Sequence, residues 1–411
     1  MATNFAFFME WIEFAVRWLH VITAIAWIGS SFYFIALDLG LRPSSSKAKG
    51  VAGEEWQVHG GGFYFLQKYT VAPDQMPDDL IWFKWESYST WLSGFAMLVL
   101  VYYFGADLYL VDPDVAALSI AGAIALSLAS LGFGWLAYDA LCKSRLGANS
   151  TTLMVVLYLL LVGMAYGYAQ VFSGRATMIH LGAFTATIMT ANVFFVIMPN
   201  QRIVVADLKA GRTPDAKYGK IAKQRSTHNN YLTLPVIFLM LSNHYPLAFA
   251  SKYNWLVAAL VFLMGVTIRH FFNTKHAHKG SPYWTWAVTA VLFVLIMWLS
   301  TAGIYRTNTD QETAALTGAA AKFAQAEGFE DVHQIVLGRC AMCHNSDPGW
   351  PGMSGPPKGV RLDTAQRIAT QARDIWLQAG VTHAMPPANA SHIEEEERAA
   401  IRAWYEAAVN G

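Results

Sequence analysis

The chain has 411 residues, of which 55% are hydrophobic and 14% are charged, and its formal net charge at pH 7 is +1. Soluble domains carry about 25% charged residues, and the shortfall here is uneven, because residues 306–411 hold 22 of the 57 Asp, Glu, Lys and Arg residues. This composition excludes an ordinary soluble enzyme for residues 1–305. The near-neutral charge gives no reason to expect a nucleic-acid partner.

Eight long apolar stretches follow one another in the first three quarters of the chain. Each has about the ~20 residues that a helix needs to cross ~30 Å of hydrocarbon. The predicted membrane helices run near 14–37, 87–104, 115–141, 153–172, 176–198, 232–250, 255–272 and 284–304. We therefore expect an all-α fold in which residues 1–305 form a bundle of about eight transmembrane helices in contact with membrane lipid.

The Lys and Arg residues of the connecting segments predict the orientation of the helix bundle in the membrane. Segments 38–85, 142–151, 200–231 and 269–283 carry 17 of them, whereas segments 105–114, 173–175 and 251–254 carry two. The positive-inside rule puts the first set in the cytoplasm, so both termini are expected on the outer side. The first apolar run is too long for a cleavable signal peptide and is expected to stay as an anchor.

Three histidines lie at similar depth in the outer half of the predicted bundle: His20, His180 and His244. Ionisable residues inside membrane spans mark functional sites by default. Imidazoles on facing helices are what a b-type haem needs, and Arg17 shares a helix face with His20. We expect a non-covalent haem b held by two of these histidines, with Arg17 pairing with a haem propionate. The alternative is that they are hydrogen-bonded structural histidines.

The segment 132–137 matches the dinucleotide pattern G-x-G-x-x-A. It lies inside an apolar span with no strand before it, so a nucleotide site is rejected. Close helix packing through small residues explains this segment better.

The tail has a different composition from the rest of the chain. Residues 306–326 are expected to be a linker and residues 327–411 a class I cytochrome c domain. Cys340-Ala341-Met342-Cys343-His344 is the C-x-x-C-H signature of c-type haem attachment. The two thiols add to the haem vinyl groups and the histidine reaches the iron. A redox C-x-x-C motif, the alternative, would be expected in a βαβ setting.

Met385, in His383-Ala384-Met385-Pro386-Pro387, is the expected sixth haem ligand. Met/His ligation raises the reduction potential, which suits an electron acceptor. Met353 and His383 are the alternatives. Haem c is attached outside the bacterial cytoplasmic membrane, and eight spans with outward termini put Cys340 on that periplasmic side.

The chain resembles the membrane-bound urate hydroxylases of bacteria over nearly its whole length. Residues 13–33, 56–64, 82–88 and 340–344 carry the resemblance. The first block is also similar to the opening span of membrane protoporphyrinogen oxidases, which bind a b-type haem through the histidine at the position of His20. The resemblance alone implies urate as substrate and 5-hydroxyisourate as product. It also implies that electrons reach a soluble cytochrome c or a terminal oxidase rather than dioxygen directly.

A urate anion needs a cation to hold it and a base to accept a proton. Arg225, His228 and Asn229 cluster at the cytoplasmic mouth of the sixth predicted span. His59, Lys84 and Glu86 are expected to join them from the first connecting segment and the second span. Arg225 or Lys84 is the expected anion ligand, and His228 or Glu86 the expected base.

Several alternatives stay open at this stage. Arg225 and Lys84 also fit the role of positive-inside anchors, and a site beside Arg17 and Glu13 would place substrate oxidation on the outer side. The rival function is an electron-relay subunit that takes electrons from quinol or a partner and binds no small substrate. A different purine or a reduced porphyrin is a further possible substrate.

Overall fold

The computed structural model describes residues 2–44, 50–73, 76–112, 115–301, 318–351, 353, 356–357 and 360–410. Helices occupy all eight predicted apolar stretches. They are α1 (Ala2–Gly40), α2 (Trp85–Met97) continued by the π-helical η1 (Leu98–Tyr103), α4 (Ile120–Lys143), α5 (Ser150–Ala169), α6 (Gly174–Ala191) continued by the π-helical η3 (Asn192–Ile197) and α7 (Met198–Lys209), α8 (Ala216–Ser242), α10 (Asn254–His276) and α11 (Trp284–Thr301). Short helices α3 (Ala106–Tyr109), η2 (Arg145–Ala148) and α9 (Pro246–Phe249) lie between them.

Within the part of the chain that the structure describes, five helical segments are long and apolar enough to cross a membrane. They are Phe8–Gly40, Ile120–Lys143, Ser150–Ala169, Gly174–Lys209 and Asn254–His276, and Trp284–Ser300 is an apolar but shorter helix. The outer faces of the bundle expose large apolar side chains such as Trp18, Leu159 and Val294, each more than 60% exposed. Soluble proteins rarely expose this much apolar surface to water. The exposed apolar side chains therefore agree with a membrane protein.

The sixth predicted span is displaced in the structure. The prediction was 232–250, whereas α8 runs from Ala216 to Ser242 and α9 begins at Pro246. The residue before a proline is disfavoured in a helix, so the chain turns between Asn243 and Tyr245. His244 therefore lies in this turn and not within a membrane helix.

The prediction of an all-α fold is wrong for residues 51–69. Strands β1 (Val51–His59) and β2 (Gly62–Tyr69) form an antiparallel hairpin. Gly60 and Gly61 at the turn have φ values of +61° and +79°, and two-residue hairpin turns of type I′ need positive φ at both positions.

Small residues allow close helix packing at the segment that matched the dinucleotide pattern. A Cβ atom at Gly134 of α4 would lie 2.4 Å from the ring of Phe184 of α6. Only glycine fits there, which confirms the prediction of close packing between helices.

The tail folds around its own hydrophobic core. Its elements are α12 (Gly318–Gln325), α13 (Phe329–Arg339), α14 (Ala341–His344), α15 (Ala365–Thr370), α16 (Ala372–Ile375), η6 (Trp376–Val381), η7 (Pro387–Asn389) and α17 (Glu395–Asn410). The expected linker is residues 306–326, and its residues 306–317 lie outside the described residues. Its last part is α12, where the Phe323 carbonyl accepts a hydrogen bond of 2.9 Å from Trp404 Nε1. The packed tail thus begins before the expected boundary at residue 327.

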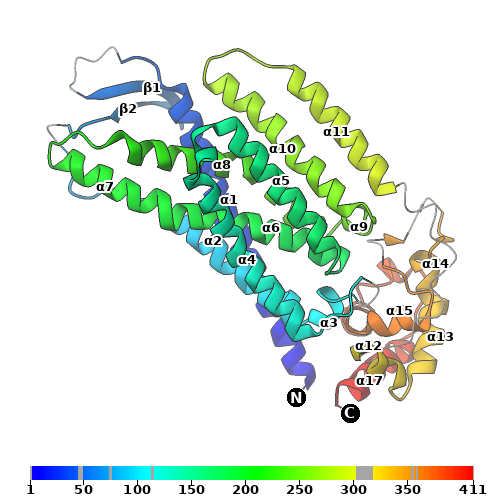
Figure 1. Ribbon diagram of the computed structural model, residues 1–411. Helices are drawn as coiled ribbons and strands as arrows, with labels where there is room; N and C mark the ends of the chain where they lie inside the picture. Colours follow the sequence, from blue (N-terminus) through cyan, green and yellow to red (C-terminus); the bar gives the residue numbers. More distant parts are fainter. Residues whose placement is uncertain are drawn as a thin grey trace.

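The tail lies against the end of the membrane domain at which α1 begins (Figure 1). Arg373 of α16 forms ion pairs with Glu10 and Glu13 of α1, the second at 3.5 Å. The β1–β2 hairpin and α7 lie at the opposite end of the bundle in the same view. The molecule therefore has a tail-facing end and a hairpin end.

Candidate functional sites

A cavity of about 200 Å³ lies between α1, α2, η1, α6 and the end of α8, toward the tail-facing end of the bundle. Most of its lining is apolar, and its charged and polar lining residues include Arg17, His20, Tyr102, Arg175, Asn243 and His244. Mostly apolar cavities with a few polar groups are typical of cofactor and ligand sites. Of the predicted haem b residues, this cavity brings Arg17, His20 and His244 together.

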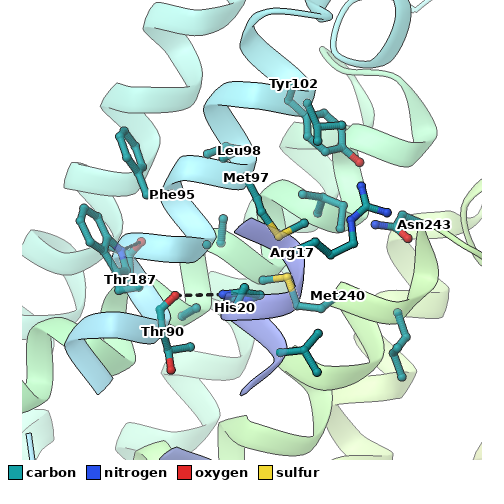
Figure 2. Close-up of a pocket in the computed structure, with 18 of the residues that line it drawn as sticks. Arg17, His20, Thr90, Phe95, Met97, Leu98, Tyr102, Thr187, Met240 and Asn243 are labelled. Atoms are coloured by element: carbon teal, nitrogen blue, oxygen red, sulfur yellow. Dashed lines mark hydrogen bonds between the residues drawn. The ribbon is translucent and has the colours of Figure 1, made fainter. Parts of the chain in front are cut away.

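His20 is held in one orientation by α2. Its Nδ1 donates to the carbonyl oxygen of Thr90 at 3.0 Å and lies 3.2 Å from Ser93 Oγ (Figure 2). A Cβ at Gly94 would lie 2.8 Å from His20 Cε1, so glycine at this position lets α2 approach the ring. A proton fixed on Nδ1 leaves the Nε2 lone pair to coordinate iron, the usual arrangement of a ligating histidine.

His180 does not line this cavity. It is fully buried among aromatic side chains, with its ring 4.8 Å from that of Phe172 and its Nδ1 donating to the Ala176 carbonyl at 2.9 Å. The structure therefore does not bring together all three histidines that the sequence suggested. Met97 and Met240 do line the cavity, and a Met thioether is also a haem ligand in cytochromes. Neither methionine is among the ligands predicted from the sequence.

A second cluster is a buried polar network between α4, η3 and the first half of α8. Arg225 is 2% exposed, and its Nη2 donates to Asp139 Oδ1 at 2.8 Å. His228 Nδ1 is 2.7 Å from the hydroxyl of Tyr138. Asn229 Oδ1 accepts a 2.9 Å hydrogen bond from Asn192 Nδ2.

Asn192 joins the parts of this network. Its amide Nδ2 also donates to the Tyr138 hydroxyl at 3.1 Å, and its Oδ1 accepts from Arg225 Nη1 at 3.4 Å. Two buried atoms of the network have no hydrogen-bond partner: Arg225 Nε and His228 Nε2. A guanidinium nitrogen and an imidazole nitrogen are therefore left unpaired close together in the protein interior.

Both clusters include residues of π-helical segments. Asn192 begins η3, and Tyr102, which lines the cavity, belongs to η1. Single π-helical turns inside α-helices frequently occur at functional sites.

The network contains Arg225, His228 and Asn229 but not the other three predicted substrate residues. Among the described residues, no hydrogen bond or ion pair connects His59, Lys84 or Glu86 to it. His59 lies exposed at the end of β1, and Lys84 precedes α2. Buried Glu86 Oε2 has no hydrogen-bond partner.

The structure gives different contacts to the two residues of the alternative substrate site, Arg17 and Glu13. Glu13 pairs with Arg373 of the tail at 3.5 Å. Its carboxylate is therefore already engaged in the contact between the two domains, whereas Arg17 points to the cavity.

The C-x-x-C-H motif lies at the end of α13 and in α14. The Nδ1 of His344 donates to the Val360 carbonyl at 2.8 Å, which leaves Nε2 for an iron. Burial, together with neighbouring Cys343, raises the pKa of the Cys340 thiol to about 12. Redox-active C-x-x-C motifs have lowered thiol pKa values, so the raised pKa of Cys340 does not favour thiol redox chemistry.

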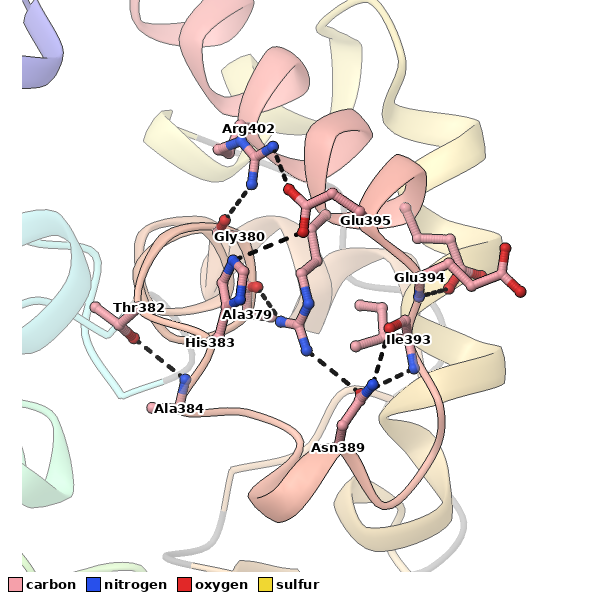
Figure 3. A network of polar contacts seen from close by, with 12 residues as sticks. Ala379, Gly380, Thr382, His383, Ala384, Asn389, Ile393, Glu394, Glu395 and Arg402 are labelled. Atoms are coloured by element: carbon pink, nitrogen blue, oxygen red, sulfur yellow. Dashed lines mark hydrogen bonds and ion pairs between the residues drawn. The ribbon is translucent and has the colours of Figure 1, made fainter.

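The loop that carries Met385 is fixed by buried Arg398 of α17. This arginine donates to the carbonyl oxygens of Ala379 and Met385, the latter at 3.1 Å. The Met385 side chain packs against the tail core that also contacts Cys340. His383, by contrast, is half-exposed and its Nε2 faces Glu395 at 3.9 Å (Figure 3).

The described residues contain no group of three or more His, Cys, Asp or Glu side chains that would hold a metal ion. A haem iron does not need one, because the porphyrin supplies four of its ligands. His20 and His344 are each held through Nδ1, which would leave Nε2 of each ring for a haem iron.

A family model described as "Urate oxidase N-terminal" matches residues 6–300. The chain belongs to the urate oxidase N-terminal family. No curated protein and no solved structure matches it. The matched region contains both the cavity and the Arg225 network, and membership of this family supports a urate-related oxidoreductase.

Proposed function

We propose that this protein is a membrane urate hydroxylase of the bacterial cytoplasmic membrane, with both termini and the tail on the periplasmic side. Urate and water give 5-hydroxyisourate, two protons and two electrons, and the electrons leave through haem to a soluble cytochrome c or a terminal oxidase. The observation that carries the proposal is the urate oxidase family match across a domain whose interior places a cation beside an imidazole.

The Arg225 network is the proposed substrate site. The unpartnered Nε–H of Arg225 is a charge-assisted donor for an oxygen of the urate anion. Asp139 holds the guanidinium in place through the 2.8 Å contact. Arg225 is thus a binding group and Asp139 a positioning residue.

His228 is the proposed base. When its Nδ1–H donates to Tyr138, the unpartnered Nε2 is free to accept a proton from urate or from the attacking water. Asn192 supports this arrangement because it donates to the same Tyr138 hydroxyl. The amides of Asn192 and Asn229 fix the wall of the site.

The haem groups supply one-electron acceptors when bound. His20, together with His244 or a cavity methionine, would hold a haem b. Cys340, Cys343, His344 and Met385 are the proposed attachment and ligand residues of haem c. The hydrogen bonds that fix His20 and His344 through Nδ1 support these roles.

The test is anaerobic reduction of the c-type haem by urate in the purified full chain. We expect urate to reduce the haem, and Arg225→Gln to lower the rate about 100-fold, in the range seen when one buried charged donor to a reacting group is removed. Arg212→Gln is the matched control, because Arg212 also pairs with an aspartate, Asp207 at 2.6 Å, but on the exposed surface.

Two results would contradict the proposal. Equal rates in the Arg225 and Arg212 variants would remove Arg225 from the substrate site. Reduction of the haem by quinol but not by urate would favour the electron-relay function instead.

A further inference from the structure

One end of the cavity holds polar atoms that the protein leaves unpaired. Arg17 Nε, Arg175 Nε, the Tyr102 hydroxyl and Asn243 Oδ1 are buried without a hydrogen-bond partner, and all four residues line the cavity. Figure 2 shows the Arg17 guanidinium between the Tyr102 hydroxyl and the Asn243 amide, away from His20. Buried polar groups without partners are costly, so this concentration at one place points to a missing ligand.

Neither arginine at this end forms a direct ion pair, although Glu13 is near enough to Arg17 to interact with it electrostatically. No carboxylate of the described residues lies within ion-pair distance of Arg17 or Arg175. The two acids that precede Arg17 on α1, Glu10 and Glu13, both pair with Arg373 of the tail.

Arg175 adds a second positive feature. It lies in the first turn of α6, where the helix dipole is positive and favours anions over cations. Its guanidinium packs over the ring of Tyr109 at 4.5 Å. Tyr102 is 4% exposed and its hydroxyl is a further donor at this end of the cavity.

We propose that Arg17 and Arg175, with the Tyr102 hydroxyl, form a subsite for the carboxylate or similar oxyanion of an organic ligand. Planar guanidinium groups bind such anions through two parallel N–H donors. Two sources offer this chemistry: the propionate groups of a porphyrin held at His20, and a free organic anion that enters the cavity. The interpretation with porphyrin propionates depends on the haem b of the proposed function. The anion subsite itself does not depend on that haem.

The experiment uses the full chain purified in detergent, with Arg17→Gln, Arg175→Gln, the double variant and Tyr102→Phe. Arg202→Gln, at an exposed position on α7 at the hairpin end, is the control. The readouts are the ratio of b-type to c-type haem from a pyridine haemochrome spectrum, and the Kd of urate from equilibrium dialysis. The c-type haem content and monodisperse elution report folding.

Loss of a charge-assisted pair predicts at least about tenfold weaker binding. A tenfold fall in the b-to-c ratio of the double variant assigns the subsite to the porphyrin. A retained ratio with a tenfold rise in the Kd of urate assigns the subsite to the free anion, and it moves the urate site from the Arg225 network to this cavity. If neither quantity changes, the subsite does not exist.

If the double variant does not fold, conservative single variants test the subsite instead. Arg17→Lys and Arg175→Lys retain the charge but lose the planar fork, so intermediate binding supports the subsite and unchanged binding overturns it. Urate-dependent reduction of the c-type haem in the unaltered protein tests the proposed function separately. A failure of the anion subsite is therefore distinguishable from a failure of the proposed urate hydroxylase function.

Discussion

The ion pairs between Arg373 and α1 predict that electron delivery to the tail depends on salt. Arg373, Glu10 and Glu13 have side chains 28%, 30% and 16% exposed, so the contact is partly shielded from water. Arg17, at the cavity, follows Glu13 by one helical turn. Arg373→Gln removes both ion pairs and with them the charged contact that holds the tail at the cavity end of the bundle.

The expected effect follows from the number of pairs. An exposed ion pair contributes about 0.2–1 kcal/mol, so two carboxylates on one partly buried guanidinium contribute about 1–2 kcal/mol. Since about 1.4 kcal/mol is a factor of ten, the ratio of docked to undocked tail should fall about 5- to 30-fold.

The assay is stopped-flow mixing with urate under anaerobic conditions while the c-type haem absorbance is followed. At low ionic strength the Arg373→Gln rate should be lower by up to this factor. The unaltered protein should slow toward the variant at 1 M salt, where the Debye length is about 3 Å. Glu10→Arg and Glu13→Arg combined with Arg373→Glu should restore part of the rate.

Lys322→Gln is the control, because it removes a positive charge from an exposed position on α12. If Arg373→Gln matches Lys322→Gln in rate and in salt dependence, these ion pairs do not hold the tail in place for electron transfer.

Three further predictions concern haem and pH. Gly94→Ala should lower the b-type haem content, because the new Cβ would lie 2.8 Å from His20, whereas Gly163→Ala, with nothing within 4 Å, should not; equal haemochrome spectra would contradict this. Met385→Leu should keep the covalent haem but lower its reduction potential in a redox titration, since the thioether ligand raises it; an unchanged potential would exclude Met385. Burial raises the pKa of Asp363, but hydrogen bonds from two arginines and a backbone amide lower it to about 2. The tail should therefore be stabilised above about pH 4 and lose that stability as the pH falls to 2, and Asp363→Asn should flatten this part of a thermal unfolding profile.

Hydrophobicity alone predicted where the apolar helices lie, although only five of the helical segments described are long and apolar enough to cross a membrane. The ends were predicted less well. The sequence predicts a connecting segment for residues 200–231, whereas α8 already begins at Ala216 and includes Arg225 and His228. The hairpin had a readable signal, since Gly60-Gly61 is a two-residue turn between two segments that contain aromatic residues typical of strands.

The candidate sites were predictable only in part. Arg225, His228 and Asn229 are neighbours on one helix, so their clustering follows from the sequence. Tyr138 and Asn192 are 90 and 37 residues away from their partners on α8, and a single sequence does not show which distant polar residues meet. The same holds for Arg175 and Tyr102 in the cavity.

The continuous helix from Gly174 to Lys209 has 36 residues, which corresponds to about 54 Å at 1.5 Å per residue. The hydrocarbon layer is only ~30 Å thick. If the first turn of this helix lies at one surface of the hydrocarbon layer, about 24 Å at its C-terminal end extends beyond the other surface. This end of the helix, the hairpin and the charged half of α8 would then form a stalk in the aqueous compartment opposite the tail. An antibody fragment raised against this stalk would report the sidedness of the protein in sealed vesicles without contacting the cavity or the C-x-x-C-H motif.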